Sequence, residues 1–282
     1  MLKIFNTSIF IITLALQLVI SKACFAELPQ HAPVPGGVAV IKIIHSGVIS
    51  AYYKNRQVLM KKSDGNLYAV VGISLSSKPG TKKIKLKTRN NTFTQTFSIK
   101  KKKYKSQHIT IKNKRKVNPN AEDMKRIRKE RKFITQALTH WQDNPIPTTR
   151  FIQPVKGIFS SPFGLKRFFN GQARRPHSGL DIAAPEGTPV IAPADGKIIT
   201  TGNYFFNGNT VFIDHGQNLI TMYNHLSEII KPVGTIVKQG NIFAKVGKTG
   251  RVTGPHLHWS VSLNNTRVDP LLFFTPDRKT KK

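Results

Sequence analysis

The stretch GRVTGPHLHWSVSL, from Gly250 to Leu263, places two histidines two residues apart at the start of an apolar, β-branched run. Side chains alternate between the faces of a strand, so His256 and His258 should point to one face, about 6.5–7 Å apart along the strand. Two imidazoles on one buried face are costly unless their lone pairs find a partner. Either both form hydrogen bonds with polar groups or water, or the strand carries part of a metal site.

A second stretch, RPHSGLDIAAP, carries His177 and Asp181 four residues apart. Prolines and a glycine around them disfavour a helix, and residues i and i+4 of an extended segment share a face. His177, Asp181 and one of the two strand histidines can therefore form a set of two nitrogen ligands and one oxygen ligand. Catalytic zinc sites use three such ligands and leave a fourth position for water.

Four other histidines are weaker candidates. His225, in MYNHLS, ends a strand and offers a further imidazole near the same sheet. His215, in DHG, lies where a turn is expected, and we expect it to take no part in the chemistry. His45 and His108 are isolated in the N-terminal half, so we expect ordinary surface or strand histidines there.

The chain around these motifs consists of short strand candidates separated by glycines. Between residues 150 and 275 they fall at 188–192, 196–200, 210–214, 219–223, 242–246 and 256–262. This spacing, with almost no helical period, predicts an antiparallel β-sheet. The segment 166–175, KRFFNGQARR, is interpreted as a loop that either forms one wall of a cleft beside His177 or is simply solvated.

The N-terminal half is also β-rich. Between residues 32 and 114, β-branched runs alternate with turn signals such as Asn90-Asn91. Within 83–87, lysines alternate with apolar residues, as on a strand with one wet face. The chain is therefore predicted to be mainly β, with a small β-sandwich-like domain at 32–114 that carries no run of candidate catalytic side chains.

A basic connector at 115–149 separates the two β regions. Its apolar residues recur at helical spacing: Met124, Ile127, Ile134, Leu138 and Trp141. We predict a linking helix of about 20 residues from Asn120 to Trp141, with Asn118 as its cap and Pro119 in its first turn.

The first 26 residues have the pattern of an export signal. MLKIFNTSIFIITLALQLVISKACFA has a basic start at Lys3, an apolar stretch from about residue 9 to residue 20, and small residues before Ala26. We expect a signal peptide at 1–26, cleaved after Ala26. One alternative is an uncleaved anchor, although the apolar run is shorter than the roughly 20 residues that span a bilayer. The other is a lipoprotein modified at Cys24.

The protein is therefore expected to be exported, to a Gram-negative periplasm or the medium, with no stable membrane span after signal cleavage. Its 45 Lys and Arg against 13 Asp and Glu give a net charge of +32, and residues 276–282 form a basic tail. Such a charge attracts polyanions, including nucleic acid, anionic lipid headgroups and carboxylate-rich wall polymers. Because we expect export, we expect no nucleic-acid partner. The single cysteine lies in the signal, so any metal site must use histidines and carboxylates.

Five motifs occur in order between about residues 150 and 275: HSGLDIAAPEGTPV, ADGKII, VFIDHG, YNHLS and GKTGRVTGPHLHWSV. Together they resemble the lysostaphin-like (LytM-type) zinc endopeptidases, which hydrolyse peptide bonds in bacterial peptidoglycan. The stretches at 34–37 and 69–80 resemble the β domain that precedes the catalytic domain in Gram-negative members. The resemblance implies that 150–275 is a zinc endopeptidase domain that holds one Zn²⁺ per chain.

The resemblance also implies a role for each residue. His177, Asp181 and His258 correspond to the metal ligands, and His225 and His256 to two catalytic histidines that do not bind the metal. None of the five departs from the family pattern. We therefore expect a secreted zinc endopeptidase that acts on stem or cross-link peptides of peptidoglycan, with zinc-activated water as the nucleophile.

Two alternatives stay open. The chain could be a non-catalytic wall-binding or hydrolase-activating protein of the same fold, or a polyanion-binding protein that uses only its basic surface. In relatives of this architecture the N-terminal domain can cover the active-site groove. We therefore also expect intramolecular restraint by that domain, with the helix and the Pro145-Ile146-Pro147 stretch as the hinge.

Overall fold

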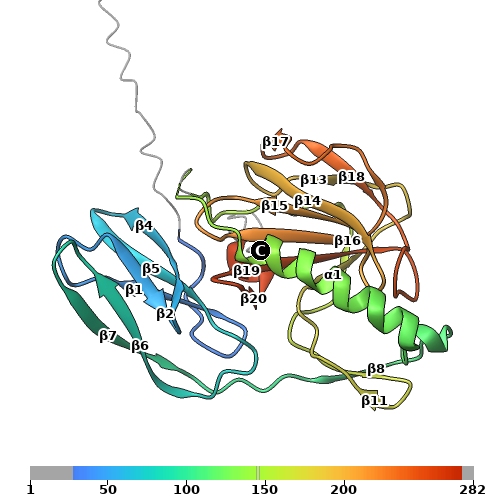
Figure 1. Ribbon diagram of the computed structural model, residues 1–282, viewed down its shortest axis with the longest axis horizontal. Coiled ribbons are helices and arrows are strands. Elements are labelled where there is room, and N and C mark those ends of the chain that lie inside the picture. Colours follow the sequence, from blue (N-terminus) through green and yellow to red (C-terminus); the bar gives the residue numbers. More distant parts are fainter. Residues whose placement is uncertain (1–27, 144, 146, 275–282) are drawn as a thin grey trace, which may run out of the picture.

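The computed structural model describes residues 28–143, 145 and 147–274. It contains two β-rich regions joined by a helix, α1 (Ala121–Thr139) (Figure 1). The predicted signal peptide at 1–26, the basic tail at 276–282 and Ile146 of the proposed hinge lie outside the described residues. Within the described part, no helix is both long and apolar enough to cross a membrane.

The N-terminal region is a sandwich of two small antiparallel sheets, with strand orders β1-β5-β4 and β3-β2-β6-β7. Its strands are β1 (Val38–Lys42), β2 (Ser50–Tyr53), β3 (Arg56–Gln57), β4 (Leu59–Ser63), β5 (Asn66–Gly72), β6 (Gly80–Lys87) and β7 (Thr92–Ile99). Both sheets contribute to one apolar core. The alternation predicted in β6 is confirmed, because Ile84 and Leu86 are buried while the lysines beside them are exposed.

The second region is built on a ten-stranded sheet with the central order β17-β14-β15-β16-β19-β12-β9, and all its pairings are antiparallel, as predicted. Its strands are β9 (Ile158–Ser161), β12 (Leu180–Ala183), β13 (Pro189–Ile191), β14 (Gly196–Tyr204), β15 (Gly208–Asp214), β16 (Ile220–Ile229), β17 (Ile236–Val237), β18 (Ile242–Val246), β19 (His256–Leu263) and β20 (Thr266–Val268). The chain also forms two short 3-10 helices, η1 (Lys114–Lys116) and η2 (Pro270–Phe273).

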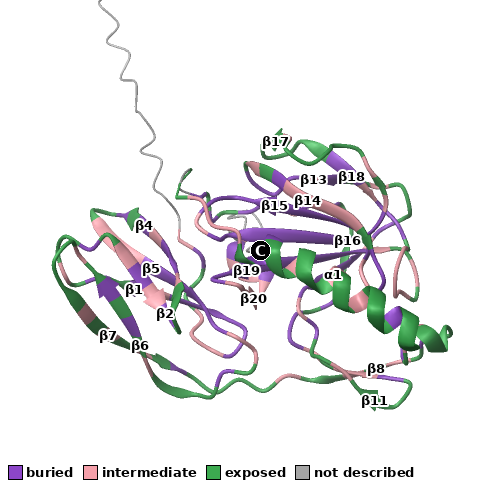
Figure 2. Ribbon diagram, in the orientation of Figure 1, coloured by how far each residue is buried: buried purple, intermediate pink, exposed green. Residues whose placement is uncertain are grey.

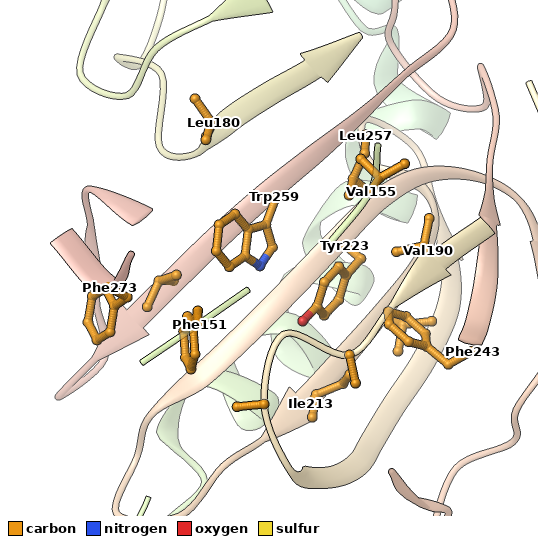
Figure 3. Close-up of a cluster of buried hydrophobic side chains, with 14 of the residues drawn as sticks. Phe151, Val155, Leu180, Val190, Ile213, Tyr223, Phe243, Leu257, Trp259 and Phe273 are labelled. Carbon is orange, nitrogen blue, oxygen red and sulfur yellow. The ribbon is translucent and has the colours of Figure 1, made fainter. Parts of the chain in front are cut away.

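Strand β19 separates the core of this region from its polar face. Leu257, Trp259 and Val261 are fully buried and belong to the main apolar cluster. Trp259 lies opposite Tyr223 of β16, and Figure 3 shows both rings within that cluster. Because side chains alternate along a strand, the histidines and serines of β19 face the other side of the sheet.

Two segments differ from the sequence prediction. The segment 166–175 is not a loop but a hairpin of β10 (Lys166–Phe169) and β11 (Gln172–Ala173). Its turn, Asn170-Gly171, has φ angles of +49° and +78°, which is the backbone that an Asn-Gly hairpin turn requires. Strand β8 (Ser106–Ile109), expected to belong to the N-terminal domain, instead pairs in parallel with β10, because the hairpin offers β8 an unpaired edge.

Helix α1 begins at Ala121, one residue after the predicted start, and its N-cap differs from the prediction. Its N-cap is Asn120 and not Asn118: the Asn120 side chain accepts from the Asp123 amide, and the Asp123 carboxylate accepts from the Asn120 amide. This capping box needs an acidic residue three positions after the cap, and Ala121 at that distance from Asn118 cannot supply it. Most of α1 is exposed, while Ala137 and Leu138 near its end are buried against the second sheet (Figure 2).

The sandwich packs against the turn between β19 and β20. The Asn264 side chain accepts a hydrogen bond from the Gly72 amide at 2.7 Å and donates one to the Gly72 carbonyl at 3.1 Å. Arg56 Nη1 donates to the Asn265 carbonyl at 3.0 Å. The apolar core of the second region also takes in three residues of the sandwich: Val38, Leu59 and Val70.

Candidate metal centre

Strand pairing brings three of the predicted site residues together. Asp181 of β12 lies directly opposite His258 of β19, and His177 lies three residues before β12. His177 Nε2 is 2.9 Å from Asp181 Oδ1 and 3.0 Å from His258 Nδ1, and the last two atoms are 2.7 Å apart. The expected ligand atoms thus form a small triangle of buried groups.

Gly179 allows this close approach. A Cβ atom at this position would lie 2.6 Å from His258 Nε2 and 2.5 Å from the Trp259 carbonyl oxygen. Any side chain would therefore push the His258 ring out of place, which explains the glycine between the two ligands of the HSGLD motif.

Each imidazole of the triangle has a hydrogen-bond partner on its other nitrogen. His177 Nδ1 lies 2.8 Å from the Pro162 carbonyl oxygen. A carbonyl only accepts, so Nδ1 carries the proton and Nε2 presents a lone pair to the triangle. His258 Nε2 lies 3.0 Å from Ser260 Oγ, and donation along this contact leaves Nδ1 unprotonated. Such partners fix the ring and tautomer of a metal-binding histidine.

The protonation states also suit a cation. Burial raises the pKa of the Asp181 carboxyl, but its contacts with His177 and His258 hold the pKa well below the usual range. Burial lowers the pKa of His258 to about 4. Arg167 Nη2 donates to Asp181 Oδ2 at 2.7 Å, which leaves Oδ1 to the triangle. At neutral pH the triangle therefore holds an ionised carboxylate and a neutral His258 imidazole.

These residues fit a zinc ion. Three lone pairs at 2.7–3.0 Å repel one another unless a proton or a metal ion lies between them. Two imidazole nitrogens and a carboxylate oxygen form a ligand set that zinc takes in catalytic sites, where it keeps one position open.

The other two predicted histidines lie beside the triangle. The ring centroid of His225 is 4.8 Å from that of His256 and 6.0 Å from that of His258. His225 Nδ1 lies 2.8 Å from the Thr249 carbonyl oxygen, and His256 Nδ1 lies 2.9 Å from the Gly254 carbonyl oxygen. Both rings therefore carry a proton on Nδ1, and Nε2 is the nitrogen left for other contacts.

An irregular backbone places His225 in the site. Strict alternation would send Asn224 and His225 to opposite faces of β16, yet both line the same cleft. His225 has a φ of +67°, and the pairing of β15 with β16 shifts register between Asn209 and Val211. Burial, followed by the charges of His256 and His258, holds the pKa of His225 well below its usual range, so its imidazole is neutral.

The remaining histidines have structural surroundings. His215 is buried, with Nδ1 2.7 Å from the Asp195 carbonyl oxygen and Nε2 2.8 Å from Thr221 Oγ1. His45 stacks on Phe93 and His108 on Phe168.

A cleft of about 770 Å³ opens over the triangle, and α1 forms the wall facing the sheet. His177, His225 and His258 line it, together with seven residues of α1: Met124, Ile127, Glu130, Arg131, Ile134, Thr135 and Leu138. Six of its lining residues are arginines and only Glu130 is acidic: Arg131, Arg167, Arg174, Arg175, Arg251 and Arg267. The sequence analysis singled out only the three between 166 and 175. Arg251 lies within the GKTGRVTGPHLHWSV motif, whereas Arg131 and Arg267 come from segments distant in the sequence, with no motif to mark them.

Comparison with known proteins identifies the family of both β regions. The chain matches the model of peptidase family M23 over residues 175–270 and that of the peptidase family M23 N-terminal domain over 31–102. A crystal structure assigned to peptidase M23, from Pseudomonas aeruginosa, is 43% identical and has a TM-score of 0.74; the match covers 86% of this chain and 95% of that one.

Curated relatives match less than half of the chain. The DD-carboxypeptidase/endopeptidase Mpg of Neisseria meningitidis is 43% identical over 117 residues, which are 42% of this chain and 27% of the relative. The peptidoglycan DD-endopeptidase ShyA of Vibrio cholerae is 43% identical over 123 residues, which are 43% of this chain and 29% of the relative. The match thus spans less than a third of the length of either relative.

Proposed function

Because the chain belongs to peptidase family M23, we propose that it is an exported, zinc-dependent endopeptidase that hydrolyses stem or cross-link peptides of peptidoglycan. One observation carries this proposal: the buried triangle of His177, Asp181 and His258 lies in a cleft beside two further histidines with free Nε2 atoms. Relatives named for DD-endopeptidase activity support the substrate class.

The three ligands would hold zinc through His177 Nε2, Asp181 Oδ1 and His258 Nδ1. When bound, zinc lowers the pKa of a coordinated water towards 7 and polarises the scissile carbonyl. Arg167 fixes the Asp181 carboxylate through Oδ2, so that Oδ1 stays available as a ligand. The Pro162 carbonyl and Ser260 keep the two imidazoles in the ligand tautomer.

His225 and His256 supply the proton chemistry. Each presents Nε2 as an acceptor, because a backbone carbonyl holds the proton on Nδ1. One of them accepts the proton of the attacking water, and a protonated imidazole can stabilise the developing oxyanion or protonate the leaving amine. The two rings lie close enough for both to act on the same peptide bond of the substrate.

The six arginines of the cleft favour an anionic substrate. Stem peptides of the wall carry carboxylates, and a positive cleft raises the local concentration of such ligands and their association rate. The alternative is a non-catalytic wall-binding or hydrolase-activating protein of the same fold. The complete set of ligands and catalytic histidines argues against it.

We also propose that α1 restrains access to the cleft. Among the described residues, none from β1 to β7 lines the cleft, whereas α1 supplies one of its walls, so the restraint is assigned to the helix and not to the sandwich. Glu130 Oε2 accepts from the Phe205 amide at 2.8 Å, and Leu138 is buried with Met222 of β16. These contacts hold the helix over the site.

Zinc analysis and digestion of purified wall sacculi test the main proposal. His258→Ala is expected to lose both zinc and peptide release, because it removes a ligand. His256→Ala is expected to keep zinc and to lose about 10²–10⁴-fold in rate, as for removal of a general acid or base. His45→Ala, distant in the sandwich, serves as the control and should keep both. Full zinc and full turnover in His258→Ala would contradict the ligand assignment, and an inactive, zinc-free wild type would favour the alternative.

A further inference from the structure

Arg267 lies on the cleft face of the sheet, next to β19. Val268 beside it is fully buried in the main core, so Arg267 faces the opposite side, which is the side of His258. Arg267 pairs with Ser262 on one edge of β19, yet its Nη2 lies 3.6 Å from Met222 Sδ of β16 on the other edge. The side chain therefore crosses β19 near Ser260 and Ser262, the two small residues at this end of its cleft face.

The guanidinium has no counter-ion. Among the described residues, no carboxylate forms an ion pair with Arg267, and its buried Nε has no hydrogen-bond partner. The neighbouring Ser262 Oγ is also buried without a partner. Burial lowers the pKa of Arg267 to about 10, so the side chain is charged at neutral pH. Arg267 as a whole is partly exposed, but its Nε is buried without a hydrogen-bond partner, which is costly to a folded protein, and it lies beside a second unused donor.

The second cavity beside Arg267 adds positive charge. A second cavity, of about 450 Å³, adjoins the residue where the sandwich meets the sheet, and Lys54 and Arg56 line it. Among the described residues, no acidic side chain lines this cavity. Arg267 lines both cavities, so it marks a positive end of the catalytic cleft.

The distance from the metal centre can be read from β19. Ser262 stands four residues after His258 on the same face, which is about 13 Å at the rise of a strand. An extended peptide that follows β19 advances by about 3.3 Å per residue. A group bound at Arg267 would therefore lie three or four residues from a bond held at the ligand triangle.

We propose that Arg267 forms a subsite that binds a carboxylate of the substrate peptide, three or four residues from the bond that is cut. The inference rests on the proposed endopeptidase function and names a specificity determinant for it. Arg267 offers the Nη atoms of its planar guanidinium, whose geometry matches a carboxylate. The bound carboxylate supplies the counter-ion that the folded chain lacks.

Paired substrates test this subsite. One synthetic wall peptide carries a free carboxylate at the stated distance from the scissile bond, and its twin carries an amide there. Arg267→Met is expected to raise KM for the free acid at least tenfold with little change in kcat, and to leave KM for the amide unchanged. Arg89→Met, which removes the same charge from the exposed turn between β6 and β7, should change neither.

Stability and binding measurements separate this role from a structural one. Because Arg267 Nε is buried without a partner and no described carboxylate pairs with the guanidinium, Arg267→Met should keep or raise Tm, whereas a structural arginine would lower it. Equal losses on both peptides, or a fall in Tm of several degrees, would overturn the proposal. Calorimetry in the His256→Ala background needs no turnover: addition of Arg267→Met should weaken binding of the free acid alone. If wild type cleaves neither peptide the proposed function fails, while the calorimetry still decides the subsite.

Discussion

The four imidazoles around the metal centre are each fixed through their second ring nitrogen. Three of the partners are backbone carbonyls, those of Pro162, Thr249 and Gly254, which can only accept. The fourth, Ser260, turns Nε2 of His258 away from the site and leaves Nδ1 beside Asp181. His256, by contrast, uses Nδ1 on its carbonyl and keeps Nε2 4.0 Å from Asp181 Oδ1. His256 and His258 lie on one strand face but present different nitrogens to the site, because Gly254 holds Nδ1 of His256 and Ser260 holds Nε2 of His258.

His215 should make stability depend on pH. Burial lowers its pKa from 6.5 to about 4. Between these values the unfolded chain binds a proton that the folded chain does not, so this stability is present above pH 6.5 and is lost as the pH falls towards 4. The difference corresponds to about 3 kcal/mol at 1.36 kcal/mol per pKa unit. Urea unfolding of wild type and His215→Gln between pH 4 and 7 should show a shallower slope in the variant. An equally steep slope would contradict it.

Among single elements, β19 is predictable from the sequence and the 166–175 hairpin is not. The alternation of Leu257, Trp259 and Val261 with polar residues determines both the strand and its buried face. The only local indication of this hairpin is the Asn170-Gly171 dipeptide, which is typical of a tight hairpin turn. The pairing of β8 with β10 left no local signal, because the choice of strand partner is a tertiary contact between segments about 60 residues apart. Arg167 in β10 and Pro162, directly after β9, likewise reach Asp181 and His177 through tertiary contacts.

Glu130→Ala should loosen α1 and raise activity. Glu130 accepts from the Phe205 amide and pairs with Arg126, and a hydrogen bond to a charged group contributes about 1.5–3 kcal/mol. If α1 restrains the cleft, a loss of about 1.4 kcal/mol in the stability of its closed position raises the population of molecules with an open cleft about tenfold. The initial rate on a soluble wall peptide then rises with that population. Glu122→Ala, exposed on the same helix, is the matched control. A lower rate in Glu130→Ala alone would show that α1 is a required wall of the cleft.

At the scale of the whole molecule, the two β regions are not independent bodies. Val38, Leu59 and Val70 of the sandwich are buried in the core of the second region, and β8 pairs with its hairpin. The two β regions and the linking helix could be predicted from hydrophobic periodicity and turn signals in the sequence. Their docking did not, because the contacts between Gly72 and Asn264 join positions that no sequence pattern relates. Substitutions in α1 therefore test restraint better than removal of the first 149 residues, which would expose this shared core.

The net charge of +32 predicts a strong effect of salt on wall digestion. The Debye length falls from about 10 Å at 0.1 M salt to about 3 Å at 1 M, so attraction between the basic surface and wall carboxylates is screened. Peptide release from sacculi at low substrate concentration should fall about tenfold between 50 and 500 mM NaCl. Cleavage of a short, uncharged peptide should change little, because the chemistry lies in a buried site.

His258→Ala should bind sacculi with the same dependence on salt while releasing nothing, since attraction needs the charge and hydrolysis needs the metal. Release that is insensitive to salt would show that the charge does not direct the enzyme to the wall.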